Sequence, residues 1–497
     1  MDLFNSLSDS NIKDLIKAFD KIKKGEIKTE DINYNELISY FKNKDEKNEL
    51  LLLLLNNEKN ESKTLFNYLK LRISLMEENL INFININKSL KSEGFFQKIF
   101  EQNLIYINDD LRITIFYSLF ENMKYSEEYH VRQYEKYITL DRIKSKNFKE
   151  KKICDKHLTK SIFGQLFQKL GDLESKFFLK NKGQNLFNVK LKGESAIDLG
   201  GPYREILSDI IKELQSDYIG LFIKTGNNLY IINPNANNIN YNKAFEFIGK
   251  LMILAISSDE TLNFYLHPII WKCLLENEIS FEEYETIDFN FYNTITKLEE
   301  GLIKKDENLI NSFDLRFEIN FNGKIITLIE NGGETKINLK NVKKFIDLAK
   351  SKILEEINNQ IKYIKNGLYS GIEKNILKIL NWKQLEKMVC GEPVFNIEDF
   401  KRHTKCDEKL KEVKWYWEWL DNCKEEDKFK YLKFVSGRSR LPNTDYNHSI
   451  IVMKNSDYKL PIAHTCSSEL ELSEYKYKDL LFKAMDIAIN QKEMYIS

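Results

Sequence analysis

The sequence predicts a mostly helical α+β protein, and three observations support this fold class. The chain contains 6 prolines and 19 glycines among 497 residues, so the two residue types that interrupt helices are scarce. Apolar residues recur at helical spacing over long stretches, and short alternating runs between them indicate strands. Hydrophobic residues make up 42% of the chain, which is enough for buried cores and excludes a disordered chain.

Composition also disfavours several classes of function. The 75 basic and 75 acidic side chains give a net charge of zero, whereas a nucleic-acid-binding protein usually has a basic excess. The most apolar run, residues 50–55, is far shorter than the roughly 20 residues that span a membrane. We find no secretory signal at the N-terminus, and the six cysteines are too scattered for a disulfide framework. We therefore expect a cytoplasmic protein, with the nucleus as the alternative, that binds no nucleic acid and has no membrane span.

The first elements are helical. Residues 1–137 contain successive amphipathic patterns but no motif that indicates a chemical role. Residues 187–191 then alternate as a strand and lead through Gly200-Gly201 into a helix with Pro202 in its first turn. The glycine-rich motifs of phosphate-binding loops are absent here, so we interpret the two glycines as a tight turn. Residues 244–256 are apolar on most sides, which predicts a central helix.

The later elements mix helices with strands. Residues 268–340 contain a helical pattern at 269–277 and a strand-like stretch at 314–329 that ends in a turn. A helical pattern then runs from 341 to 364, continues through 382–390 and stops at 391–393, where Gly and Pro mark a domain boundary. Beyond it we expect a helix at 414–432, a strand at 449–454, a short strand and loop at 459–466, and a helix at 477–491.

The most informative segment for chemistry is the loop 460–466, which contains His464, Thr465 and Cys466 before the last helix. The thiolate is the reactive form of cysteine, and a nearby imidazolium or oriented N–H groups lower the pKa of the thiol. Alternate residues of an extended segment lie on the same side, so His464 could share a face with Cys466 and assist thiolate formation. The alternative is a small buried cysteine beside a hydrogen-bonded surface histidine, and spacing alone favours that alternative.

The other cysteines and histidines give weaker signals. Three cysteines lie in helical patterns, Cys154, Cys273 and Cys423, and Cys390 closes a helical pattern. We interpret all four as structural residues. His403 and Cys406 have HxxC spacing without the second pair that a structural zinc site needs, so we expect no metal site. A papain-like thiol protease needs a distant histidine and an orienting Asn or Asp, which no motif here indicates.

Seven segments follow one another along the chain: ITLDRIK (138–144), VKLKGESAIDLGGPYRE (189–205), FEFIGKLMILAI (245–256), VCG (389–391), FKRHT (400–404), FVSGRSRLP (434–442) and KLPIAHTC (459–466). In that order, and ending on the HTC loop, they make residues 138–497 resemble a HECT domain, the catalytic module of one class of ubiquitin ligases. A single segment would be weak evidence, whereas seven in family order are specific.

The resemblance implies a bilobal domain preceded by an α-helical region, residues 1–137, of unknown role. The larger helical N-lobe would cover 138–391 and recruit a ubiquitin-conjugating enzyme through a small subdomain at about 268–340. Gly391, Glu392 and Pro393 would form the hinge, and the smaller α/β C-lobe, residues 392–497, would carry the catalytic cysteine. Candidate aromatic anchors for the conjugating enzyme are Phe317 and Phe321, and burial in a core is the equal alternative for both.

The resemblance also implies the activity of an E3 ubiquitin-protein ligase, an acyltransferase. Ubiquitin would pass from the conjugating enzyme to Cys466 as a thioester and then to a substrate lysine, with His464 and Thr465 in supporting roles. The expected partners are the ubiquitin-charged conjugating enzyme, ubiquitin and protein substrates. No cofactor is expected, because ATP is consumed upstream when ubiquitin is charged.

The chain departs from the family pattern at several positions. After HTC the family usually continues with Phe-Asn, where this chain has Ser467-Ser468. Lys459 replaces the usual Arg, and Met494 stands where many members have a Phe, with Tyr495 next to it. Ser467-Ser468 and Met494 leave open, as the first alternative, a HECT-like scaffold that is catalytically weak or inactive. A thiol hydrolase that acts on ubiquitin is the second alternative.

Overall fold

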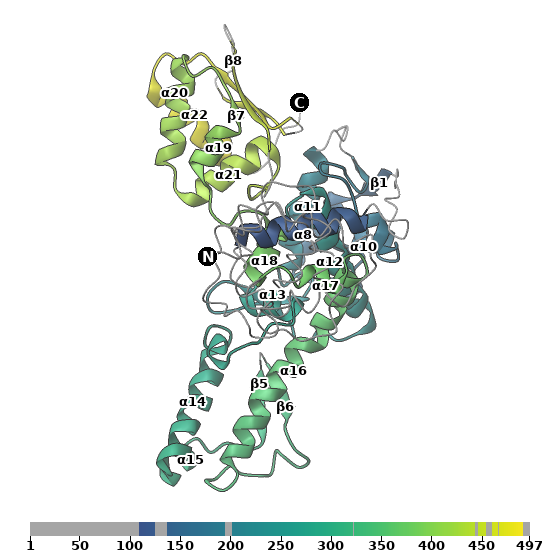
Figure 1. The fold of residues 1–497 in the computed structure, drawn as a ribbon, viewed down its shortest axis with the longest axis vertical. Helices are drawn as coiled ribbons and strands as arrows, with labels where there is room; N and C mark the ends of the chain where they lie inside the picture. The colour runs from purple at the N-terminus through teal and green to yellow at the C-terminus, as the bar shows by residue number, and fades with distance from the viewer. Residues whose placement is uncertain are drawn as a thin grey trace, which may run out of the picture. The chain divides into compact units, whose positions relative to one another are not determined.

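The computed structural model describes residues 109–124, 137–193, 201–321, 323–442, 446–453, 460–465 and 467–490. Over these residues the chain is mostly helical, with one four-stranded sheet and three two-stranded sheets (Figure 1), which confirms the predicted α+β class. The chain divides into two compact units, one of residues 1–123 with 378–380 and one of residues 124–377 with 381–497.

The first unit is described over helix α8 (Asp109–Lys124), which belongs to it up to Met123, and over residues 378–380. Phe116 and Phe120 lie one turn apart on α8, stack with 5.5 Å between their ring centroids and are fully buried. The Arg112 guanidinium donates to the carbonyl of Ile379 over 3.4 Å. The other helices predicted within residues 1–137 lie outside the described residues.

The second unit begins with a two-stranded parallel sheet. β1 (Tyr137–Leu140) pairs with β2 (Asn188–Leu191), and the buried side chains of the two strands lie opposite one another, Ile138 with Val189 and Leu140 with Leu191. The strand predicted at 187–191 is therefore confirmed. Between the two strands lie α9 (Arg142–Glu150), α10 (Ile162–Leu170) and the 3₁₀ helix η6 (Ser175–Phe178).

Three long helices contribute much of the apolar core: α11 (Gly201–Leu214), α12 (Ile239–Ser258) and α16 (Val342–Tyr369). Pro202 lies in the first turn of α11, where its missing N–H breaks no helical hydrogen bond. α12 is buried along most of its length, as predicted, and packs against α16. A Cβ on Gly367 of α16 would lie 1.9 Å from the carbonyl oxygen of Glu246, so this crossing requires glycine. A hairpin of β3 (Phe222–Lys224) and β4 (Tyr230–Ile232) lies between α11 and α12 in the chain.

Residues 268–340 form the expected mixed region. α13 (Pro268–Leu274) confirms the predicted helix, and the strand-like stretch forms a hairpin of β5 (Glu318–Phe321) and β6 (Lys324–Thr327). The sequence patterns did not predict the other elements here, the 3₁₀ helix η7 (Phe281–Thr286), α14 (Phe289–Lys304) and α15 (Glu307–Ser312). Figure 1 shows α14 beside the first part of α16.

The helical patterns predicted at 341–364 and 382–390 are confirmed, but they belong to two separate helices with a short third helix between them. α16 ends at Tyr369, α17 (Lys374–Leu377) is one turn long, and α18 (Trp382–Cys390) starts after its own capping residue. That residue is Asn381, whose side chain accepts a hydrogen bond from the N–H of Gln384 at 3.0 Å. α18 ends at Gly391, as predicted.

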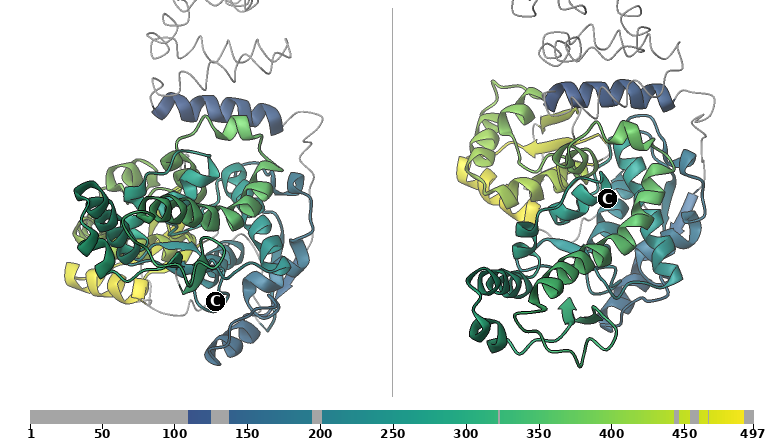
Figure 2. Two further views of the ribbon diagram at one scale, coloured as in Figure 1. Left: turned by 90° about the horizontal axis from the view of Figure 1, so that it is seen from below. Right: turned by 60° about the horizontal axis from the view of Figure 1, so that its bottom comes forward.

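Residues 395–489 contain an apolar core of their own. The helices around it are α19 (Ile397–Arg402), α20 (Lys411–Asn422), α21 (Glu425–Ser436) and α22 (Lys478–Asn490). The single helix predicted at 414–432 is wrong, since Cys423 and Lys424 take extended backbone conformations (ψ of 144° and 155°) and separate α20 from α21. The right-hand view of Figure 2 shows α22, in yellow, beside these yellow-green helices.

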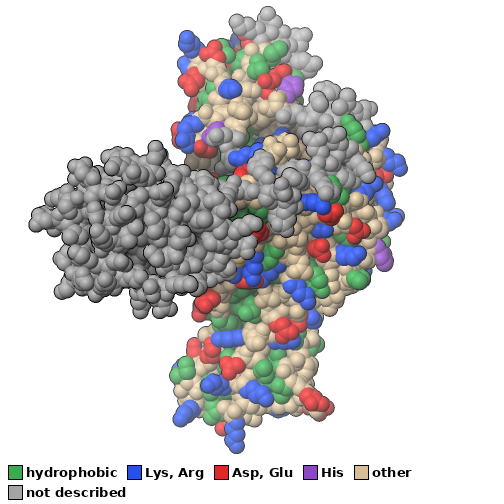
Figure 3. Space-filling model, turned by 45° about the vertical axis from the view of Figure 1, so that its right-hand side comes forward, with side chains coloured by type: hydrophobic (Ala, Val, Ile, Leu, Met, Phe, Trp, Pro, Cys, Tyr) green, Lys and Arg blue, Asp and Glu red, His purple; other side chains and the backbone are tan. Residues whose placement is uncertain are grey.

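Charge on the surface is mixed. Figure 3 shows Lys and Arg side chains interspersed with Asp and Glu side chains over the described residues of one face, in keeping with the net charge of zero. Among the helices that the structure describes, none combines the length and the apolar character needed to cross a membrane.

Candidate active site

The segment that contains the predicted nucleophile connects two strands of the four-stranded sheet. The strands lie in the order β7 (Thr404–Lys405), β8 (His448–Met453), β10 (Glu469–Ser473) and β9 (Ile462–His464), and β9 is antiparallel to β10. We call the connection between β9 and β10, residues 465–468, the active-site loop. Its predicted nucleophile, Cys466, lies outside the described residues, whereas Thr465 and Ser467 on either side are described as turn residues.

The structure bears on how His464 relates to Cys466. The expectation that the two share one face assumed an extended backbone through the HTC segment. β9 ends at His464, and the N–H of Ser467 turns back to donate to the carbonyl of His464 over 3.2 Å. Strand alternation therefore stops before Cys466, and it does not define the side on which the thiol lies.

A buried histidine holds the far end of the active-site loop. His448 is 1% exposed, and its Nδ1–H donates to the carbonyl of Ser468 over 2.5 Å. With the proton on Nδ1, Nε2 accepts a hydrogen bond from the hydroxyl of Tyr431 over 2.8 Å. Burial lowers the pKa of His448 to about 4, so the imidazole is neutral at pH 7 and keeps this arrangement.

A buried ionic cluster contacts the near end of the loop. Nη1 of Arg204, in the first turns of α11, donates to the carbonyl of Thr465 over 3.1 Å. Nε of the same side chain lies 3.2 Å from Oε1 of Glu260, and Nη2 of Arg438 lies 3.1 Å from that oxygen. The Glu260 side chain is 2% exposed, so two guanidinium groups compensate one buried carboxylate.

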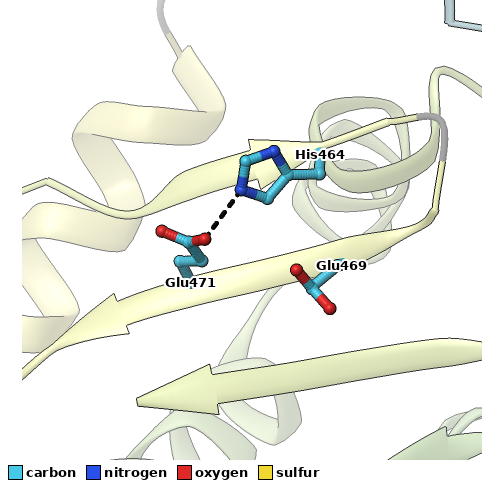
Figure 4. A group of neighbouring side chains, drawn as sticks. All are labelled: His464, Glu469 and Glu471. Atoms are coloured by element: carbon cyan, nitrogen blue, oxygen red, sulfur yellow. Dashed lines mark hydrogen bonds and ion pairs between the residues drawn. The ribbon is translucent and has the colours of Figure 1, made fainter. Parts of the chain in front are cut away.

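A third group of side chains lies on the strands beside the loop. Figure 4 shows His464 on β9 facing Glu469 and Glu471 on β10, with Nε2 of His464 2.8 Å from Oε1 of Glu471. The three side chains offer ligand atoms within 4.8 Å of one another, a spacing that a metal ion could accept. The hydrogen bond between His464 and Glu471 across neighbouring strands accounts for the arrangement by itself. In the part of the chain that the structure describes, His403 and Cys406 join no group of this kind.

The five described cysteines all have a raised thiol pKa. Burial raises the pKa of Cys273, Cys390 and Cys423 to about 12, and burial also raises the pKa of Cys154 and Cys406. These thiols are therefore protonated at pH 7 and are poor nucleophiles. Cys273 and Cys390 are buried core residues as predicted, whereas Cys154 and Cys423 are half-buried and lie outside the helices.

The predicted hinge is described, and its first residue is closely enclosed. Gly391 ends α18 at φ 83°, a backbone region that favours glycine. A Cβ at this position would lie 2.5 Å from the carbonyl oxygen of Leu441 and 2.8 Å from Cγ2 of Thr261. The N–H of Glu392 donates to the same Leu441 carbonyl over 2.9 Å, and Pro393 is exposed.

The two aromatic residues expected to anchor the conjugating enzyme are buried. Phe317 and Phe321 are each 1% exposed, and Phe317 packs edge-to-face against Phe345 with 5.7 Å between the ring centroids. Alternation along β5 turns Ile319 and Phe321 into the interior. Of the two readings given equal weight for Phe317 and Phe321, surface anchor and buried core residue, the structure shows the buried one. The large apolar side chains that are exposed in this region include Phe289, Ile303 and Ile325.

Sequence reasoning missed the residues that hold the active-site loop. Arg204 and Arg438 lie inside quoted motif segments, GGPYRE and SGRSRLP, but neither was assigned a role. Glu260 and His448 lie in no motif, and the contacts among these residues join distant parts of the chain. Glu260 lies four residues beyond the segment predicted to be central, 244–256, so the pattern gave no signal for it.

With this geometry in view, comparison with known proteins identifies the family. The model of the HECT-domain (ubiquitin-transferase) family matches residues 208–496, which is more than half of the chain. The chain therefore belongs to the HECT-domain family, and its C-terminal part is a ubiquitin-transferase domain, as the sequence resemblance indicated.

Several E3 ubiquitin-protein ligases match the chain at about a quarter identity. The chain is 26% identical over 381 residues to the human E3 ubiquitin-protein ligase HERC2, and the matched residues cover 72% of this chain and 8% of that protein. It is 27% identical over 324 residues to the ligase pub3 of Schizosaccharomyces pombe, covering 61% of this chain and 40% of that protein. It is 27% identical over 328 residues to human NEDD4, covering 61% and 24%. The matches thus span less than half the length of these relatives.

Proposed function

We propose that this protein is a HECT-type E3 ubiquitin-protein ligase that receives ubiquitin as a thioester on Cys466 and transfers it to substrate lysines. The observation that carries the proposal is the family match, which continues through residue 496 and so includes the active-site loop. The cysteines support it by elimination, because burial raises the thiol pKa of all five described cysteines and leaves Cys466 as the candidate nucleophile.

The reaction consists of two exchanges of one acyl group. The Cys466 thiolate attacks the carbonyl of the ubiquitin C-terminus, a new C–S bond forms, and the thiolate of the conjugating enzyme leaves. A neutral lysine amine of the substrate then attacks the Cys466 thioester, the Cys466 thiolate leaves, and the amine loses a proton to give an isopeptide bond. The first exchange converts one thioester into a similar one and is therefore nearly isoenergetic, whereas formation of the amide bond drives the second exchange.

The loop residues described in the structure support this scheme through position. His464 is held by Glu471 at the end of β9, and Thr465 begins the turn with its carbonyl bound to Arg204. We assign both residues a supporting role and assign the reacting atoms to Cys466. The ligase itself requires no cofactor in this scheme.

The proposed organisation is bilobal. We place the N-lobe at 138–391 and the C-lobe at 392–497, because α18 ends at Gly391 and residues 395–489 have their own core. We start the domain upstream of the family match, since β1 at its beginning pairs with β2 directly before α11. The region 268–340 is proposed to bind the conjugating enzyme, and residues 1–137 are assigned no role.

The proposed partners follow from the reaction. They are a ubiquitin-charged conjugating enzyme, ubiquitin itself and protein substrates, and the proposed location is the cytoplasm, with the nucleus as the alternative. A second function, an inactive HECT-like scaffold, is favoured only by the replacement of the usual Phe-Asn by Ser467-Ser468 and by Met494 near the C-terminus.

Mixing the full chain with charged conjugating enzyme on a non-reducing gel tests the proposal. We expect a ubiquitin adduct that disappears on addition of thiol, and its complete loss in Cys466→Ala, because the acyl-accepting sulfur is gone. Cys466→Ser should trap an oxyester that resists thiol. The matched control is Cys406→Ala, which removes a half-buried thiol elsewhere and should form the adduct normally.

Other outcomes point to the alternatives. A wild-type chain that forms no adduct would support the scaffold, and release of free ubiquitin without adduct or chains would support a hydrolase. An adduct that persists in Cys466→Ala would contradict the assignment of the nucleophile.

A further inference from the structure

Three helix ends converge on the ionic cluster of Arg204, Glu260 and Arg438. Arg204 lies near the N-terminus of α11, Glu260 follows the left-handed cap of α12 at φ 62°, and Arg438 follows the left-handed cap of α21 at φ 73°. The carbonyl ends of α12 and α21 carry partial negative charge, which favours guanidinium groups beside them. The two guanidinium groups therefore compensate the Glu260 carboxylate in a largely buried place.

The cluster has two guanidinium groups for one carboxylate, so its three charged groups carry a net positive charge. Glu260 lies 3.2 Å from Nε of Arg204 and 3.1 Å from Nη2 of Arg438, and both arginine side chains are mostly buried, at 16% and 15% exposure. The planar fork of Arg204 can bind Glu260 through Nε while Nη1 remains directed elsewhere. Nη1 is used on the carbonyl of Thr465, the residue directly before Cys466.

The same cluster adjoins the proposed hinge. Thr261, next to Glu260, and Arg440, two residues after Arg438, both lie against the position that a Cβ on Gly391 would occupy. Ser208, one turn beyond Arg204 on α11, contacts Ser439 with 3.5 Å between their hydroxyl oxygens. The contact to the active-site loop and the contacts around Gly391 thus form one continuous region of the second unit.

We propose that Arg204 is a positioning residue for acyl transfer: held by Glu260, its guanidinium binds the Thr465 carbonyl and fixes the loop that carries Cys466 in one of the placements that the two-step reaction needs. This inference rests on the proposed function. Cys466 must meet a conjugating enzyme in one step and a substrate lysine in the other, so a contact that fixes one placement favours one step. A reacting group displaced by about 1 Å loses up to about a hundredfold in rate.

The test measures the two steps separately in the full chain, by single-turnover kinetics at saturating charged conjugating enzyme and saturating free lysine. We expect Arg204→Ala to slow one of the two steps by about tenfold or more. Glu260→Gln should slow the same step, because it removes the charge that holds the guanidinium. Arg204→Lys keeps the charge but not the fork, so its rate should fall between those of wild type and Arg204→Ala.

The matched control is Arg142→Ala. It removes another arginine that forms an ion pair with α11, because Arg142 lies 2.7 Å from the carboxylate of Glu205. It should leave both steps within about twofold of wild type, since the loop is bound by Arg204 and not by this ion pair. The melting temperature and the affinity for the charged conjugating enzyme are measured for every variant.

The outcomes separate the inference from the proposed function. Slowing of one step, with the other step and the affinity unchanged, supports positioning by Arg204. The inference is overturned if Arg204→Ala leaves the rates unchanged, or if both steps slow equally and the melting temperature falls strongly. In either case an adduct formed by the wild-type chain would still support the proposed function. A wild-type chain without any adduct overturns both.

Discussion

At the scale of the residue, the turn after Cys466 depends on a buried imidazole. Ser468 has φ 55°, a left-handed backbone conformation that Asn adopts more readily than most residues. The HECT family usually has Asn at this position. His448 binds the carbonyl of Ser468, and burial together with Tyr431 fixes the tautomer. We infer that this hydrogen bond stabilises a turn for which serine alone is less suited.

His448 gives the first residue-scale prediction, a dependence of stability on pH. Its pKa is about 4 in the folded chain, against 6.5 as its ordinary value. Below pH 6.5 the unfolded chain therefore binds a proton that the folded chain does not, so stability is lost as the pH falls from 6.5 towards 4. The loss between pH 7.5 and pH 5 should be about 2 kcal/mol for this residue.

Urea unfolding of wild type and His448→Gln at pH 7.5, 6 and 5 measures this term. Glutamine can donate to the Ser468 carbonyl and accept from Tyr431, but it does not titrate. His267, whose pKa burial also lowers to about 4, and the carboxylates act in both proteins and cancel in the difference. Equal slopes of unfolding free energy against pH in the two proteins would show that His448 is not the source.

The residues around the active-site loop also show what the sequence could predict of the site. The HTC segment was found because neighbouring residues and family order carry its signal. Arg204, Glu260 and His448 contribute through contacts across the fold, Arg204 with Thr465 and His448 with Ser468. No local spacing encodes such pairs, so a single sequence gives no means of joining them.

At the scale of the element, apolar periodicity located most helices and strands but not their ends. The helices α11, α12 and α22 and the strands β2 and β8 lie where the patterns placed them, because each buries one face or more. The breaks after α16 and between α20 and α21 were missed. At Cys423 the chain leaves the helix without Gly or Pro, and apolar spacing is nearly the same on both sides of the break.

The hairpin of β5 and β6 gives a prediction at this scale. Ile325 is 69% exposed, whereas its neighbour Ile326 is 6% exposed and pairs with Ile319. If the region 268–340 binds the conjugating enzyme, Ile325→Asp should weaken that binding by about tenfold, because apolar anchors dominate such interfaces. The melting temperature should stay unchanged.

Ile326→Asp is the matched comparison, since it places the same charge one residue further along the same strand. A charge in the core should lower the melting temperature strongly, and the same holds for Phe317→Asp. Calorimetry and a binding titration with charged conjugating enzyme give both readouts. Unweakened binding in Ile325→Asp would remove this strand from the proposed docking surface.

At the scale of the whole molecule, the proposed two-step reaction leads us to expect a connection that can move. In the structure this connection is held closed by backbone contacts: Gly391 abuts the carbonyl of Leu441, and the N–H of Glu392 donates to it. The buried contact of Arg438 with Glu260 also joins the two proposed lobes, so a movement at this connection has to break that ion pair as well. Gly391 supplies the backbone freedom that a hinge uses.

Replacement of residues 391–393 by three prolines tests this account. Proline cannot adopt the φ of 83° found at Gly391, and it removes the N–H of Glu392, so the connection becomes stiff and loses its closed geometry. Binding of the conjugating enzyme should be unchanged, because the proposed site lies within 268–340. Formation of the Cys466 adduct, its discharge to lysine, or both should slow by about tenfold or more in single-turnover assays.

The control for this replacement is Glu392→Ala, which keeps the N–H and loses only the partly exposed ion pair with Lys387. Such a pair contributes little, so both transfers should keep their wild-type rates in the control. If the triple-proline chain also carried out both transfers at the wild-type rate, one fixed placement of the lobes would serve both partners. Arg204 would then hold the active-site loop in the only placement that it uses, and removing its contact would slow both steps rather than one.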